Sequence, residues 1–232
     1  MKKPNFSVVV VLALFALAIG NSAQAQVPPS QAEAAGYTGL HAAAWAGDVA
    51  EIRRLAATSA EIDATDGNGR TPLHVAAFAS HEPAVAALVE LGADANRLED
   101  DKYDIITIAA VAGDAEMVRL ATSIGGNSAN VTSIYDGTAL IAASHLGHAE
   151  VVQALIDAKA PLDHINNLGW TALLEVVILG DGGPRHLATA RALVAAGADG
   201  TIADRQGRTP LDHARERGYT EMIALLETVQ KR

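Results

Sequence analysis

The chain has 232 residues, half of them hydrophobic, no cysteine, and a formal net charge of −10 from 17 basic and 27 acidic side chains. The absence of cysteine excludes disulfides, thiolate metal sites and cysteine nucleophiles. The acidic excess is unfavourable for binding nucleic acid or an anionic membrane, since both require clustered positive charge, so neither is expected as a partner.

Residues 1–25 have the three-part layout of a secretory signal peptide. Lys2 and Lys3 form the basic end, residues 8–19 are apolar, and Ala23 and Ala25 give a small-x-small cleavage site. The apolar stretch is shorter than the roughly 20 residues that span a membrane. We therefore expect cleavage after Ala25, no membrane attachment afterwards, and a periplasmic location, with an extracellular location as second choice.

Residues 26–35 form a leader before the main body of the chain. Pro28 and Pro29 are typical of a linker, and Ser30 can cap a short helix that covers the first folded unit.

A repeating pattern then runs from residue 36 to residue 232. Thr71 can cap a helix, Pro72 suits its first position, and small residues follow at helical spacing. The same phrase recurs at steps of about 33 residues, anchored on Leu40, Leu73, Ile106, Leu140, Leu173 and Leu211. The period predicts six units of two helices each, over about 36–65, 66–98, 99–132, 133–165, 166–203 and 204–232. No unit can close its own core, so the units must stack.

The repeat resembles that of the ankyrin-repeat family, whose signature is T-P-L-H-x-A. "TPLHVA" at 71–76 and "TPLDHA" at 209–214 carry forms of it, and "VAALVELGADAN" at 85–96 resembles the second helix and its exit. The resemblance implies an all-α solenoid of six helix-turn-helix units with β-turn or hairpin tips. It also implies that partner proteins meet the turn tips and the exposed face of the first helices.

Three units depart from the pattern. The third has Lys102 in the place of Gly69, and Asp104 in the place of Thr71, so it loses a glycine but keeps a capping oxygen. The fourth has one extra residue. The fifth has five extra residues within Leu179–His186, where glycines and a proline predict a flexible or sharply turned surface loop.

The aromatic side chains suggest where a partner binds. After residue 25 the chain has seven aromatics, and six of them fall at positions that the family varies. Aromatic side chains often dominate interface energies, and acidic tips can add specificity. The predicted contact residues are Tyr37, Trp45, Phe78, Asp100, Asp101, Tyr103, Tyr135, Trp170 and Ile178. The alternative is that some of the rings pack against the neighbouring unit.

The histidines and acidic clusters give little sign of a metal. The resemblance implies that His41 and His74 hydrogen-bond between adjacent turns. His145 and His148 are three residues apart but have no evident third ligand, and the acidic stretch at 98–104 has no calcium-loop spacing. We expect no metal and no cofactor.

No catalytic motif is present, and the adjacent Asp212 and His213 should point to different helix faces. The sequence therefore predicts a noncatalytic module that presents a rigid, concave, aromatic and acidic surface to a periplasmic protein. One alternative is an enzyme or small-ligand carrier whose site lies at the insertion 179–186, with Asp181, Arg185 and His186. Another, suggested by the resemblance alone, is a protective accessory of an oxidative-stress enzyme such as catalase.

Overall fold

The computed structural model describes residues 26–58 and 61–229. These residues form thirteen helices and no strand, with a single antiparallel β-bridge between Thr132 and Gly137 at one turn tip. The signal-peptide prediction falls on residues outside the described ranges. The expected all-α solenoid is confirmed, and its tips are turns with this one bridge.

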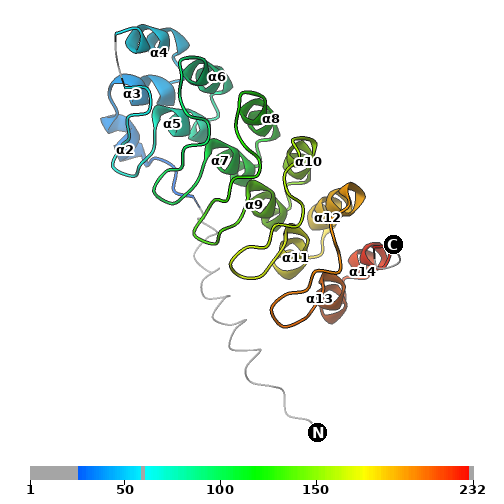
Figure 1. Ribbon diagram of the computed structural model, residues 1–232. Coiled ribbons are helices and arrows are strands. Elements are labelled where there is room, and N and C mark those ends of the chain that lie inside the picture. The colour runs from blue at the N-terminus through cyan, green and yellow to red at the C-terminus, as the bar shows by residue number, and fades with distance from the viewer. Residues whose placement is uncertain (1–25, 59–60, 230–232) are drawn as a thin grey trace.

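The helices form two layers that advance together along the solenoid (Figure 1). After the leader helix α2 (Gln31–Gly36), the inner layer consists of α3 (Gly39–Trp45), α5 (Pro72–Phe78), α7 (Ile105–Ala112), α9 (Ala139–Leu146), α11 (Ala172–Ile178) and α13 (Pro210–Arg217). The outer layer consists of α4 (Val49–Ala56), α6 (Glu82–Glu90), α8 (Ala115–Ser123), α10 (Ala149–Asp157), α12 (Pro184–Ala196) and α14 (Thr220–Leu226). Each inner helix packs against its outer partner and against the inner helices of the adjacent repeats.

Five of the six inner helices begin at a capping side chain that satisfies a free backbone N–H group, whereas Thr38 before α3 makes no such bond. The Thr71 hydroxyl accepts a hydrogen bond from the His74 N–H, and Thr209 does the same for Asp212. Asp104, which replaces threonine in the third repeat, accepts from the Thr107 N–H at 2.8 Å. The prediction that this unit keeps its cap is confirmed.

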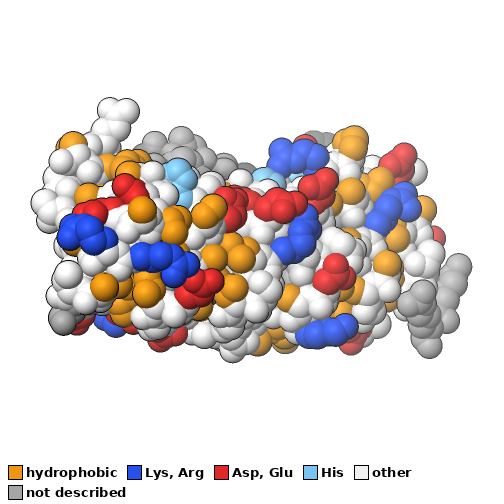
Figure 2. Space-filling view, turned by 90° about the horizontal axis from the view of Figure 1, so that it is seen from above, with side chains coloured by type: hydrophobic (Ala, Val, Ile, Leu, Met, Phe, Trp, Pro, Cys, Tyr) orange, Lys and Arg blue, Asp and Glu red, His pale blue; other side chains and the backbone are white. Residues whose placement is uncertain are grey.

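A single apolar core runs through all the repeats. Small side chains on the inner helices, such as Ala76, Ala110 and Ala143, are fully buried and let neighbouring backbones approach closely. The outer helices fill the space behind them with larger groups, such as Leu88 and Leu155. Viewed from above, over the outer helices, charges of both signs are interspersed on the surface (Figure 2). The outer side therefore has the composition of a solvated surface.

The leader is an ordered part of this structure. Ser30 caps α2 through a capping box with Glu33, so the predicted covering helix is confirmed. The hydrogen bonds from Ser30, followed by the one from Arg70, lower the pKa of Glu33 to about 2. The cap therefore favours an ionised Glu33 that faces the second repeat.

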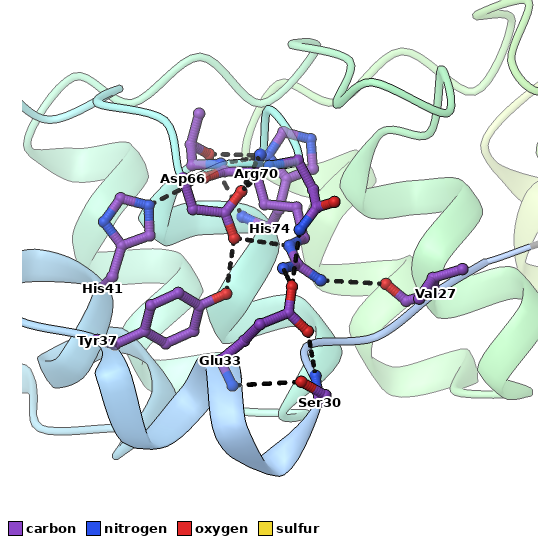
Figure 3. A network of polar contacts seen from close by, with 10 residues as sticks. Val27, Ser30, Glu33, Tyr37, His41, Asp66, Arg70 and His74 are labelled. Carbon is purple, nitrogen blue, oxygen red and sulfur yellow. Dashed lines mark hydrogen bonds and ion pairs between the residues drawn. The ribbon is translucent and has the colours of Figure 1, made fainter.

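Arg70 joins the leader to the second repeat (Figure 3). Its guanidinium is 1% exposed and donates to Asp66 at 2.7 Å, to Glu33 at 2.6 Å and to the Val27 carbonyl at 3.2 Å. The Tyr37 hydroxyl donates to the same Asp66 at 2.8 Å, and burial together with this carboxylate raises the pKa of Tyr37. One buried cation thus joins two segments that are distant in the sequence, the leader and the turn of the second repeat.

The insertion in the fifth repeat forms a short turn and lengthens the helix that follows it. The turn covers only residues 179–183, and Pro184 is the first residue of α12, which at 13 residues is longer than the other outer helices. Gly182 has φ +70°, and a Cβ there would lie 2.5 Å from the Tyr219 ring. The Tyr219 hydroxyl donates to the Gly180 carbonyl at 3.0 Å. Of the two forms that the sequence allows for this loop, flexible or sharply turned, the structure has the sharp turn, and the sixth repeat packs on it.

Arg70 and Arg208 stand at the same place in two D-x-x-G-R-T-P-L stretches and so form a matched pair. Arg208 is 40% exposed in its side chain and bonds to Asp204 and Glu216 at more than 3 Å. We expect Arg70→Met to lower the free energy of unfolding by about 2 kcal/mol or more, because it leaves Asp66 without its buried partner. Arg208→Met should cost less than about 1 kcal/mol. Urea denaturation measures both, and equal losses would contradict the role of Arg70.

Candidate protein-interaction surface

A row of side chains follows the last turns of the inner helices. Because these helices pack side by side at one register, equivalent positions line up across the repeats. The row consists of Trp45, Phe78, Val111, His145, Ile178 and Glu216, all half-buried except the exposed Glu216. Figure 1 shows these helices stacked in order, so the row extends along the solenoid. We call it the inner row.

A second row lies just before the caps of the inner helices and contains three of the predicted aromatics. Tyr37 is half-buried, and its hydroxyl donates to Asp66. Trp170 is half-buried, and its backbone N–H donates to the Asn166 side chain. Tyr103 is only 4% exposed, and burial raises its pKa to about 12. Tyr103 therefore belongs to the core, and its prediction as a contact residue is wrong.

The neighbouring repeat explains why Tyr103 is buried. The fourth tip packs on this turn, with the Ser133 N–H donating to the Lys102 carbonyl at 2.9 Å, and Tyr135 on that tip adds to the rise in the pKa of Tyr103. The Tyr103 carbonyl also accepts from His74 at 3.2 Å. The ring consequently packs between two repeats.

The turn tips present the remaining predicted residues. Tyr135 is 47% exposed, and Asp100 and Asp101 are exposed. Beside Tyr135 the structure exposes two further apolar side chains, Ile134 and Ile165, which the sequence analysis did not select. Both are isoleucines within turns, where an apolar residue has no core to fill, and that signal could have identified them.

The inter-turn histidines hold the tips in register. The His41 Nε2–H donates to the Arg70 carbonyl at 2.9 Å, and the His74 Nε2–H donates to the carbonyls of Arg97 and Tyr103. Burial lowers the pKa of His74, which favours the neutral ring. The bonds between adjacent turns that the resemblance implies for these two histidines are confirmed.

A second set of histidines links the starts of the outer helices. His81 Nε2–H donates to the Trp45 carbonyl at 3.1 Å, and His186 Nε2–H donates to the His145 carbonyl at 3.0 Å. The ring of His148 packs over Gly113, where a Cβ would be 3.0 Å away. The bonds from His81 and His186 thus hold the backbone carbonyls of two inner-row residues, Trp45 and His145. The sequence analysis did not assign this role.

The residues grouped at the insertion do meet in the structure. His186 Nδ1 lies 2.8 Å from Asp181 Oδ1, while its Nε2 is bound to the preceding repeat. The Gly183 N–H and the His186 ring lower the pKa of Asp181. Arg185 donates to the Leu146 carbonyl at 2.8 Å. All three side chains thus take part in contacts within the turn or between repeats.

The Asp212–His213 pair behaves as its spacing predicts. Asp212 accepts from the Thr209 N–H at 2.9 Å and completes a cap, whereas His213 Nε2 lies 2.8 Å from Asp204 Oδ2. The two side chains therefore face different partners. Within residues 26–58 and 61–229, no group of three or more His, Asp or Glu side chains could hold a metal ion.

Glu175 is the residue of this surface that the sequence analysis missed. It lies on α11, is only 4% exposed, and accepts a hydrogen bond on Oε1 from the Asn166 side chain at 3.0 Å. Its Oε2 accepts no hydrogen bond from any described residue, and His145 Nδ1 is 3.8 Å away. Burial raises the pKa of Glu175 to about 7. The sequence held a signal for this residue, because Glu175 stands at the repeat position that Val75, an apolar residue, fills in the second repeat.

A sequence model of the family described as "Ankyrin repeats (3 copies)" matches residues 11–99 and 106–203. The chain belongs to the ankyrin-repeat family. No helix in the described part of this ankyrin-repeat protein has the length and apolar character to cross a membrane.

Sequence relatives are similar over part of the chain. The ankyrin repeat protein YahD of Escherichia coli (strain K12) is 37% identical over 98 residues, which is 42% of this chain and 49% of YahD. The ankyrin repeat and KH domain-containing protein CBG24701 of Caenorhabditis briggsae is 38% identical over 43% of this chain and 4% of its own length. The chain thus spans about half or less of these relatives.

Solved structures match over more of the chain. A crystal structure of an ankyrin repeat domain from Acinetobacter baumannii AYE is 40% identical with a TM-score of 0.78, covering 82% of this chain and 97% of that one. The ankyrin repeat protein EF0377 is 30% identical with a TM-score of 0.76, covering 82% and 98%. A complex of the Bdellovibrio bacteriovorus endopeptidase Bd0816 with the immunity protein Bd3460 gives a match at 22% identity and a TM-score of 0.69.

The raised pKa of Glu175 predicts a pH-dependent stability. The folded protein retains on Glu175 a proton that the unfolded chain releases near pH 4.5, so ionisation opposes folding as the pH rises from 4.5 to 7. We expect Glu175→Gln to match the wild type near pH 4.5 and to exceed it by up to about 3 kcal/mol at pH 8. Urea denaturation across this range measures the difference. The exposed Glu150→Gln serves as control, and a pH-independent difference would contradict the prediction.

Proposed function

We propose that this protein is a noncatalytic protein-interaction module of the periplasm whose partner binds the inner row and the turn tips. The ankyrin-repeat family is generally an interaction fold, and family membership supports the general role. The observation that supports this choice of surface is the inner row, in which half-buried apolar side chains such as Trp45, Phe78 and Ile178 lie on inner helices that pack side by side. Partly exposed aromatic and aliphatic groups on a fixed scaffold are typical of interface anchors.

Rigidity supports this role. The tips are joined by hydrogen bonds from His41 and His74, and the starts of outer helices are joined to inner helices by His81 and His186. A surface held in this way loses little conformational entropy when a partner binds. More of the contact energy therefore remains as affinity.

The turn tips contribute charge and further apolar area. Asp100 and Asp101 are exposed beside the second repeat, whose Asn68 carbonyl accepts from the Asp100 N–H. Farther along, Tyr135 and Ile134 are exposed on the fourth tip, and Asn167 bonds this tip to the fifth. A partner with basic residues around an apolar side chain would complement these tips.

The solved neighbours support a protein as partner. The Bdellovibrio structure is a complex of two proteins, an endopeptidase and an immunity protein. Its identity of 22% to this chain limits the comparison to the shared fold, so it supports the class of partner and not its identity.

The proposed surface can be tested by changing one aromatic side chain of the inner row together with one of the second row. We expect the double variant Trp45→Ala and Trp170→Ala to lose at least about tenfold in affinity for its protein partner, because such anchors contribute about 2 kcal/mol each. Affinity capture from periplasmic extract with quantitative mass spectrometry measures the loss. Circular dichroism verifies that the variant is folded, and Arg53→Ala with Arg119→Ala on the outer helices is the control. A folded double variant that captures every partner at wild-type levels would refute the proposed surface.

The periplasmic location has a separate test. After expression of the full chain in a Gram-negative host, the protein should be released by osmotic shock with Gln26 as its first residue. N-terminal sequencing identifies that residue, and Ala23→Arg with Ala25→Arg should block processing. Recovery of the unprocessed chain in the cytoplasm would refute the proposed location.

A further inference from the structure

The carboxylate of Glu175 is only half satisfied by the protein itself. Asn166 donates to Oε1 at 3.0 Å, whereas Oε2 accepts no hydrogen bond from the described residues although it is buried. Burying a carboxylate oxygen without a donor is unfavourable unless the group is protonated or a partner supplies the donor. The raised pKa of Glu175, about 7, reflects this cost.

The nearest basic group does not supply that donor. His145 on α9 has its Nδ1 3.8 Å from Oε2, beyond hydrogen-bond distance. Burial, and the charge of nearby His186, lower the pKa of His145, so its ring is neutral in the range where Glu175 ionises. His145 keeps a side-chain exposure of 39% and belongs to the inner row. Glu175 thus lies next to His145, a half-buried member of the inner row.

The basic groups of the sixth repeat, which packs on α11, already have partners. His213, which holds in the sixth repeat the place of Glu175, pairs with Asp204 at 2.8 Å. Arg208 bonds to Asp204 and Glu216, and Arg217 donates to the Ile178 carbonyl. Figure 1 shows α13 of this repeat beside α11.

We propose that Glu175 receives a basic side chain, arginine or lysine, from the protein partner, with Oε2 accepting its N–H. This inference rests on the proposed function, since it assigns the partner's chemistry at the same surface. Because Oε2 is buried behind the His145 ring, that ring moves aside on binding and admits a long side chain. On binding, Glu175 gives up its proton and pairs with the cation.

The surroundings favour a guanidinium in particular. Asn166 donates to Glu175 through its side-chain amide and accepts the backbone N–H of Trp170 on its Oδ1, so the turn that holds the carboxylate also carries an aromatic residue. A guanidinium can bond to a carboxylate and stack on an aromatic ring at the same time. Residues 26–184 carry 7 basic and 21 acidic side chains, an excess that attracts a basic partner.

The proposal predicts binding of a small arginine probe. The tripeptide acetyl-Gly-Arg-Gly-amide should shift the side-chain 13C carboxyl signal of Glu175 and lower its titration midpoint. The citrulline peptide, which has the same shape without the charge, should do neither. The arginine peptide should bind Glu175→Gln at least about tenfold more weakly than the wild type, and more weakly at pH 6 than at pH 8, where Glu175 is ionised.

Two controls separate the alternatives. His145→Ala should retain or strengthen binding of the arginine peptide, because the ring only shields Oε2, and Asp100→Asn with Asp101→Asn should leave the response at Glu175 unchanged. Equal responses to the arginine and citrulline peptides, or arginine-induced shifts confined to the tips, would overturn the proposal. Wild-type capture of the protein partner by Glu175→Gln would refute the role of Glu175 while leaving the proposed function intact.

Discussion

Each repeat of this chain leaves one side of its inner helix uncovered until the next repeat packs on it. Fully buried alanines such as Ala76, Ala110 and Ala143 allow that close packing, and one core extends from Leu40 to Leu226 as a result. The helices are short, and helices of seven to nine residues are not stable alone in water. Their stability therefore comes from packing between repeats, and the position of every surface residue depends on it.

Polar contacts then fix the register that apolar packing leaves adjustable. His41 and His74 tie the turns together, while His81 and His186 tie outer helices to the preceding inner ones. At the N-terminal end of the described residues, the leader lies before α3, and Arg70 joins it to the second repeat. Directional bonds of this kind keep the residues of the inner row in register from repeat to repeat, which a binding surface requires.

The same packing decides which side chains are available for binding. Tyr37, Tyr103 and Trp170 share one repeat position, yet only Tyr103 is buried in the core, where the fourth tip packs on its turn. Glu175 is buried at a place that the first four repeats fill with apolar residues, and only one of its oxygens accepts a hydrogen bond from the described residues. A conformationally fixed surface with one unsatisfied acid is able to select among partners by charge.

The sequence alone determined the period, the two-helix unit, the caps and the family, because helical spacing and capping chemistry are local properties. It predicted the covering helix after Ser30 and the retained cap at Asp104, and the structure confirms both. Only the tertiary structure decided that Tyr103 and Glu175 are buried and that Tyr219 packs on the turn of the insertion. These depend on which side chain the neighbouring repeat places opposite, and that contact joins residues about one repeat apart in the sequence.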